Sequence, residues 1–168
     1  MEPDDDRAVA LLGRYYGRPY LSQGCANGAY FDEWAAGGDP YRFSADDLIA
    51  ISLLSVNATA DAARALPRDR SDEFAKLLVA VGPVRDLAGE QQPLGASWPG
   101  WHLMRELRTL PGVGTTIASK LLARKRPRLR PIWDRLVANV TNTCESQWEP
   151  LREALSADGM ALQDRLRI

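Results

Sequence analysis

Five residues, Leu110-Pro-Gly-Val-Gly114, interrupt a helical pattern and constrain this chain more than any other stretch. Apolar residues recur at helical spacing on both sides of it. Proline cannot continue a helix, and glycine permits the tight turn that joins two packed helices. The pattern therefore predicts two helices, at about 100–110 and 115–125, joined by a two-glycine hairpin.

The same hairpin is suited to bind an anion. Glycine has no side chain, so Gly112 and Gly114 let backbone amides come close to a ligand. The amides that open the second helix are unpaired and lie at the positive end of its dipole, which favours phosphate. We therefore expect DNA contacts at Gly112, Val113, Gly114, Thr115 and Thr116. The alternative is a purely structural turn between two helices.

Charge is distributed unevenly along the chain. The net charge is −1 overall, but residues 1–100 carry −6, residues 101–140 carry +7 and residues 141–168 carry −2. A local positive segment is typical of a nucleic-acid contact, even in a protein with no net positive charge. We therefore expect phosphate contacts from Lys120, Arg124, Lys125, Arg126, Arg128 and Arg130. The alternative is that these cations form a solvated loop.

The remaining periodic stretches also have helical spacing, and none alternates as a strand does. The chain is therefore expected to be all-α, with further helices at about 6–16, 44–55, 58–66, 71–81, 131–141 and 147–157. We divide it into residues 1–42, an N-terminal helix and irregular segment of uncertain role, and residues 43–168, a helical domain that contains the hairpin. The last segment stops in mid-pattern, as it would in a fragment truncated at its C-terminus.

Composition excludes several classes of protein. No apolar run is long enough to span a bilayer, and the acidic start MEPDDDRA is unlike a signal peptide, so we expect a cytoplasmic protein. Two cysteines, Cys25 and Cys144, with one histidine, His102, exclude a disulfide framework and a four-cysteine metal site. We expect no cofactor apart from an optional monovalent cation at the hairpin. The 18 Arg against 3 Lys suggest a GC-rich bacterial genome.

Two stretches within residues 43–140 resemble the helix-hairpin-helix superfamily of DNA glycosylases, in the endonuclease III and adenine glycosylase branch. The first is the LPGVG hairpin followed by Pro131-Ile-Trp-Asp-Arg-Leu-Val137, in which Asp134 stands twenty positions after Gly114. The second is the core stretch LIAISLLSVNAT at residues 48–59. The resemblance implies a helix-hairpin-helix glycosylase fold and Asp134 as the catalytic residue. The chain is also similar to uncharacterised actinobacterial proteins that carry this hairpin.

Departures from that family narrow the expected chemistry. Members that also cleave the DNA strand carry a lysine where this chain has Thr116, so we expect a monofunctional enzyme without a Schiff-base nucleophile. Asn57 stands where many members have the glutamine that fills the gap left by a flipped base, and its alternative role is a cap for the helix at 58–66. Trp133 is a candidate for stacking on that base, as are Tyr30, Phe31 and Trp34, and the alternative is that these aromatic residues belong to the core.

The residues support the same chemistry by a separate argument. A glycosidic bond to a base breaks through a positively charged sugar, which a nearby carboxylate stabilises while it orients the attacking water. Asp134 is the lone carboxylate between Glu106 and Glu145. Its alternative role is a helix N-cap or a salt bridge to Arg130 or Arg135.

We therefore expect a protein that binds double-stranded DNA and hydrolyses the N-glycosidic bond of a damaged or modified base. The alternatives are a catalytically inactive DNA-binding member and a protein-interaction domain with the same fold. No membrane partner is expected, and the oligomeric state stays open.

Overall fold

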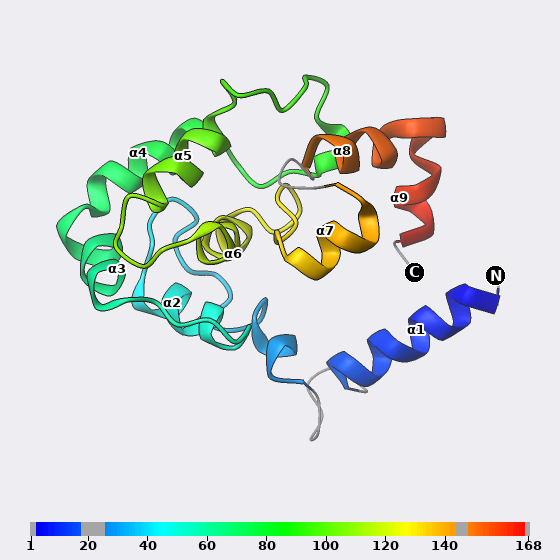
Figure 1. The fold of residues 1–168 in the computed structure, drawn as a ribbon, viewed down its shortest axis with the longest axis horizontal. Coiled ribbons are helices and arrows are strands. Elements are labelled where there is room, and N and C mark those ends of the chain that lie inside the picture. The colour runs from blue at the N-terminus through cyan, green and yellow to red at the C-terminus, as the bar shows by residue number, and fades with distance from the viewer. Residues whose placement is uncertain (1–2, 18–25, 144–147, 167–168) are drawn as a thin grey trace.

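The computed structural model describes residues 3–17, 26–143 and 148–166, and within these ranges it is helical throughout, with no strand (Figure 1). The all-α expectation is therefore confirmed for the described chain. Cys25 and Cys144 lie outside it. The helices are α1 Pro3–Tyr16, α2 Ala45–Ser52, α3 Ala60–Arg64, α4 Ser71–Val81, α5 Pro99–Leu107, α6 Thr115–Lys125, α7 Arg135–Thr141, α8 Trp148–Ser156 and α9 Ala161–Leu166.

Several helix boundaries follow the sequence signals closely. Helix α6 begins and ends at the predicted residues, and Ser44 and Asp47 form the expected capping box at the start of α2, where the Ser44 amide donates to Asp47 at 2.8 Å. The predicted end of the helix at 58–66 was wrong: the chain does not stop coiling before Pro67 but continues through a π-helical turn, Ala65–Asp69. The Arg70 amide closes that turn by donating to the Ala65 carbonyl at 2.8 Å.

The core lies where α2, α4, α5 and α6 meet. Helix α4 packs against α5, and α6 packs against both α2 and α5. Most of the largest fully buried apolar side chains come from these elements and their connections: Ile51, Leu66, Phe74, Leu78, Leu103, Leu107, Leu121 and Leu122. Trp148, on α8, and Leu87 are also fully buried. Burial of each such side chain contributes about 1.5–3 kcal/mol, so α6, which buries both of its leucines, lies at the centre of the fold.

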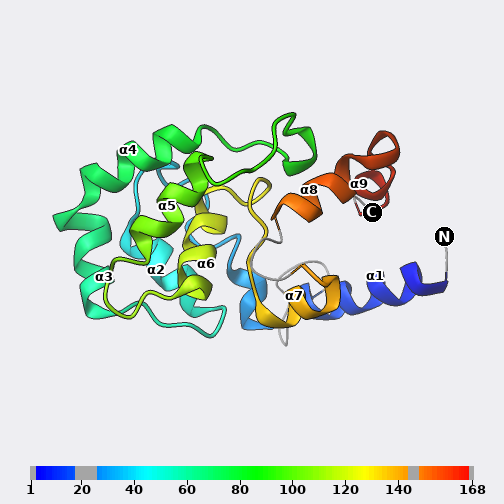
Figure 2. The same ribbon diagram turned by 45° about the horizontal axis from the view of Figure 1, so that its top comes forward.

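Helices α1, α7, α8 and α9 lie to one side of this core (Figure 1). Helices α7, α8 and α9 follow the core helices at the right of Figure 1, and α1 lies along the lower edge. The two ends of the chain lie at the same end of the molecule in both ribbon views (Figure 2), where Asp5 and Arg165 form an ion pair at 2.6 Å. This pair is partly exposed, so it contributes about 1 kcal/mol or less.

Three cations at the end of α6, Arg124, Lys125 and Arg126, bind the interior and are called here the carbonyl clamp. Arg124 donates to the carbonyls of Phe31, at 2.6 Å, and Trp34. Lys125 forms a buried ion pair with Asp47 at 2.6 Å and donates to the Asp39 carbonyl at 3.0 Å. The clamp thus fastens the irregular stretch around residues 31–40 to the central helix.

Arg126 is the most deeply buried member of the carbonyl clamp. Its side chain is 0% exposed and donates to the carbonyls of Gly82 at 2.6 Å, Pro40 at 2.8 Å and Leu78 at 2.8 Å. Burial lowers the pKa of Arg126 below its ordinary value. Buried carbonyls need hydrogen-bond donors, and the Arg126 guanidinium supplies donors to three of them, at the end of α4 and in the loop before α2.

The other two arginines of the basic run differ from each other. Arg130 is also fully buried, with its guanidinium 3.4 Å from the centre of the Trp98 ring and 4.9 Å from that of Trp148. Burial lowers its pKa to about 9. Arg128 is exposed and lies 3.5 Å from Asp86.

The expectation that the whole basic run contacts phosphates was therefore wrong for Arg124, Lys125, Arg126 and Arg130. Their charged groups bind carbonyls, Asp47 or tryptophan rings inside the protein. A charge count along the sequence does not distinguish a cation that faces solvent from one that serves as a donor to buried carbonyls. Of the five cations in residues 124–130, Arg128 alone has an exposed side chain that could reach DNA.

The carbonyl clamp predicts that substitution of Arg126 lowers the free energy of unfolding far more than substitution of Arg128, two positions away. Arg126→Met leaves several buried carbonyls without donors, so we expect the free energy of unfolding to fall by about 3 kcal/mol or more. Arg128→Met, the matched control at the surface, should change it by less than about 0.5 kcal/mol. Urea denaturation of both variants checks this, and equal losses would show that Arg126 does not clamp the interior.

Candidate functional site

The hairpin has the conformation that its glycines allow. Between α5 and α6, Gly112 adopts φ +75°, in the left-handed region that favours glycine, and Gly114 is extended at the N-cap of α6. Val113 is buried and anchors the turn, whereas both glycines are exposed. The sequence thus folds locally as predicted, into a helix, an exposed glycine turn and a second helix.

Thr59, which caps α3, braces this turn from the side. Its hydroxyl donates to the Pro111 carbonyl at 2.8 Å and accepts from the Ala62 amide at 3.2 Å. A Cβ atom at Gly112 would collide with the Thr59 methyl group, whereas a Cβ atom at Gly114 would meet nothing. Gly112 is therefore required by the packing, and Gly114 leaves open space in front of the hairpin.

The start of α6 offers its amides to that open space. No side chain caps the helix at Gly114, and the first bond back to the turn is from the Ala118 amide to the Gly114 carbonyl, at 3.0 Å. The preceding amides of a helix have no partner within it and carry its positive partial charge. Thr115 and Thr116 are partly exposed beside them, so Gly112, Gly114, Thr115 and Thr116 form one surface. The expected DNA contact from Val113 was wrong for its side chain, which is buried in the core.

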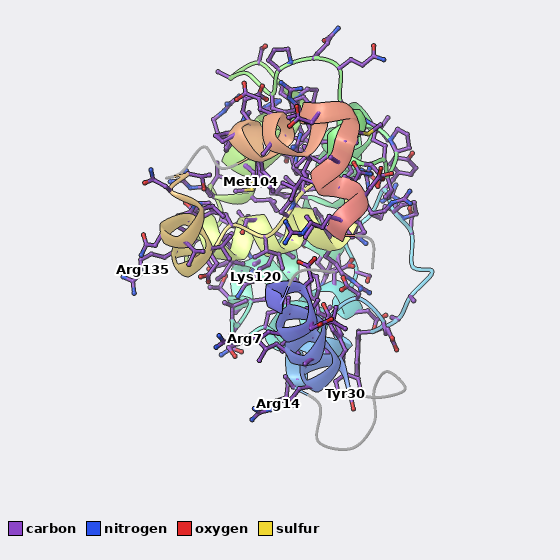
Figure 3. The ribbon with its side chains drawn as sticks, turned by 90° about the vertical axis from the view of Figure 1, so that its right-hand side faces the viewer. Arg7, Arg14, Tyr30, Met104, Lys120 and Arg135 are labelled. Carbon is purple, nitrogen blue, oxygen red and sulfur yellow. The ribbon has the colours of Figure 1, made fainter. Side chains whose placement is uncertain are left out.

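Lys120 lies inside the protein, one helical turn after Thr116. Its side chain is 7% exposed and its ammonium donates to the Leu54 carbonyl, just beyond α2, at 2.7 Å. The expected role of Lys120 as a phosphate contact or solvated charge was therefore wrong. Figure 3 shows Lys120 within the ribbon, while Arg135 projects outward from α7.

Lys120 also interacts with Asp134, the expected catalytic residue. Burial lowers the pKa of Lys120, and the negative charge of Asp134 acts in the opposite direction. Next to Lys120 on α6, the Ser119 hydroxyl donates to the Trp133 carbonyl at 3.2 Å. Helix α6 thus carries the hairpin at its start and holds the Asp134 segment against its middle.

Asp134 stands immediately before α7 and is partly exposed. Its carbonyl accepts the Ala138 amide at 2.8 Å, as the carbonyl of an N-cap residue does. Helix α7 therefore begins at Arg135, four residues later than predicted. The catalytic and the N-cap role of Asp134 are both compatible with this position, since a residue that begins a helix can also present its carboxylate to a ligand.

The loop after α2 carries Asn57, the expected base-gap wedge. Asn57 is exposed and lies two residues before Thr59, which contacts the hairpin. Its alternative role was a helix cap, but Thr59 caps α3 instead. Ser55 in this loop has φ +60°, a region that residues other than glycine seldom occupy and that recurs at functional sites.

Sequence reasoning missed the exposed cations nearest the hairpin. Arg105 and Arg108 lie at the end of α5 and directly after it, and Arg135 opens α7 beside Asp134; all three are exposed. Their sequence positions, close to the hairpin and to Asp134, could have identified them as candidate phosphate contacts. The denser run of cations at 124–130 drew the prediction away from them.

No described part of the chain brings together three or more His, Cys, Asp or Glu residues that could hold a metal ion. His102 is exposed and lies 3.7 Å from Glu106. Similarly, no described helix is long and apolar enough to cross a membrane.

A family model described as a family of unknown function (DUF6308) matches residues 8–168, and the chain belongs to that family. The match includes most of α1 as well as the hairpin and Asp134. No curated protein and no solved structure matches the chain.

The bracing by Thr59 predicts opposite outcomes for the two hairpin glycines. Gly112→Ala places a Cβ atom against Thr59 at a positive φ, so we expect the free energy of unfolding to fall by about 2 kcal/mol. Gly114→Ala, which adds the same methyl group into open space, should cost less than about 1 kcal/mol. Thermal and urea unfolding of the pair measures this, and a larger loss in Gly114→Ala would contradict the described turn.

Proposed function

We propose that this protein binds double-stranded DNA through its hairpin and hydrolyses the N-glycosidic bond of a damaged or modified base, with Asp134 as the catalytic residue. The observation that carries the proposal is the arrangement on α6. The helix begins with amides that have no partner within it and that no side chain caps at Gly114, and Ser119 and Lys120 interact with the segment of Asp134. A phosphate held at the hairpin would therefore keep its nucleotide close to a carboxylate.

Hydrolysis of an N-glycosidic bond requires a carboxylate beside the sugar. Departure of the base leaves positive charge on the sugar, and the Asp134 carboxylate would stabilise that charge and orient the attacking water. Lys120 is a positioning residue in this scheme, because its buried ammonium attracts Asp134 while it is fixed by the Leu54 carbonyl. Thr116 stands in place of a nucleophilic lysine, which supports a monofunctional reaction.

The surface charge available for phosphates is smaller than the sequence suggested. The inward direction of the carbonyl clamp leaves Arg105, Arg108, Arg128 and Arg135 as exposed cations in this part of the chain. These can position a duplex without reading its sequence, and binding should weaken as salt concentration rises. Asn57, on an exposed loop beside Thr59, stays the candidate for the gap left by an extruded base.

One observation favours a catalytically inactive DNA-binding protein as the second candidate. Asp134 occupies the N-cap position of α7, a role that accounts for an aspartate without any chemistry. Asparagine caps a helix about as well as aspartate but cannot supply a negative charge. Asp134→Asn therefore separates the two candidates.

We expect the wild-type protein to produce alkali-labile abasic sites in one or more duplexes of a panel of damaged and modified bases. Asp134→Asn should reduce that release at least about 100-fold, with duplex affinity and stability retained. Gly114→Val should lose both binding and release while it stays folded, because its side chain fills the open space before the hairpin. Fluorescence anisotropy and gel analysis of cleaved strands give the two readouts.

The outcomes distinguish the candidates. Release that survives in Asp134→Asn would exclude Asp134 as the catalytic residue. Binding without release across the panel would favour the inactive DNA-binding protein. If the wild type does not bind duplex DNA at low salt, both nucleic-acid proposals fail and the protein-interaction alternative is left.

A further inference from the structure

A pocket of about 450 Å³ lies between α1 and the stretch that follows α6. Its volume falls in the range of about 300–1,000 Å³ that is common for small-molecule sites. Helix α1 contributes Tyr15 and Tyr16, and residues on the opposite wall include Leu54, Pro131 and Ile132. Two of these wall residues adjoin the candidate site: the Leu54 carbonyl holds Lys120, and Ile132 stands two residues before Asp134.

The walls of this pocket suit a flat ring. Tyr15 and Tyr16 meet edge to face with ring centres 5.0 Å apart, and Phe31 lies on the same lining. The Tyr15 hydroxyl lies over Gly28, where a Cβ atom would collide with it. The Ala26 amide donates to the Tyr15 carbonyl at 3.0 Å, which fixes this end of α1 to the wall. Aromatic faces bind bases by stacking, largely without regard to sequence.

Asp32 is the carboxylate in this lining. Arg124 of the carbonyl clamp donates to the Asp32 backbone carbonyl at 3.2 Å, and no hydrogen bond to the Asp32 carboxylate is found among the described residues. Burial raises the pKa of Asp32 despite the charge of Arg124, and burial together with Asp32 raises the pKa of Tyr16. The pocket thus combines aromatic and apolar walls with an acceptor that has unused hydrogen-bonding capacity among the described residues, and its lining also includes Arg130, whose guanidinium packs against the Trp98 ring.

We propose that this pocket binds a purine or pyrimidine base that carries an exocyclic amino group, with the amino group donating to Asp32 and the ring against Tyr15 and Tyr16. A carboxyl oxygen accepts from an amino group, whereas a keto oxygen at the same position would face it with like partial charge. The inference rests on the proposed function for the source of the base, an extruded nucleotide. A free nucleoside offers the same chemistry.

Matched nucleosides that differ by one group provide the test. Deoxycytidine should bind at least about tenfold more tightly than deoxyuridine, and deoxyadenosine than deoxyinosine, in titrations of the intact protein followed by ligand-observed NMR. In Asp32→Asn the preference should fall to near parity, because a carboxamide can face either an amino or a keto group. Asp61→Asn, a matched change at an exposed position on α3, should keep the wild-type preference.

Equal binding within each nucleoside pair by the wild type would overturn the proposal without any variant. A preference that persists in Asp32→Asn would exclude Asp32 as the acceptor. A duplex containing 2-aminopurine, which carries an amino group, identifies the source: a fluorescence change on binding that Asp32→Asn abolishes indicates an extruded base, and nucleoside binding without that change indicates a free ligand.

The proposed function and this inference can fail separately. If the protein releases bases from duplexes but binds nucleosides with and without an amino group equally, the glycosylase proposal stands and the pocket proposal is overturned. If the protein prefers amino-bearing nucleosides but does not bind duplex DNA, the pocket proposal stands and the glycosylase proposal is overturned.

Discussion

Buried hydrogen bonds from the cations of α6 to backbone carbonyls are the interaction on which the rest of this structure depends. The chain around residues 31–40 has little regular secondary structure, so its carbonyls need donors from elsewhere. Arg124, Lys125 and Arg126 supply them and join this stretch to the central helix. The same contacts fix Phe31 and Asp32 in the wall of the pocket.

The local structure around the hairpin could be predicted because its signals are themselves local. Two glycines after a proline, a capping box at Ser44 and apolar spacing along α6 determine the turn and the helix starts within a few residues of chain. The direction of the basic side chains could not be predicted, because Arg126 and Arg128 are chemically identical and two positions apart. Which of them is buried depends on carbonyls about 40–90 positions away, which no local pattern reveals.

Lys120 illustrates the same limit at the candidate site. Its helical position relative to Thr116 was visible, but its contact with the Leu54 carbonyl joins residues 66 positions apart. That contact brings the end of α2, the middle of α6 and the Asp134 segment together, next to the pocket formed with α1. A glycine hairpin with open space at Gly114, a buried Lys120 that feels the charge of Asp134 and an aromatic pocket with one acid thus lie on neighbouring parts of one framework. This grouping is what favours a base-directed activity over a purely structural hairpin.

The most direct test of this account is where duplex DNA protects the protein from hydrogen–deuterium exchange. The account predicts that saturating duplex slows exchange in peptides that cover residues 108–117, whose first helical amides have no partner within α6. Peptides that cover residues 124–130 should change little, because their side chains bind the interior in the free protein. Protection confined to 124–130, or absent from 108–117 under conditions where DNA is bound, would contradict it.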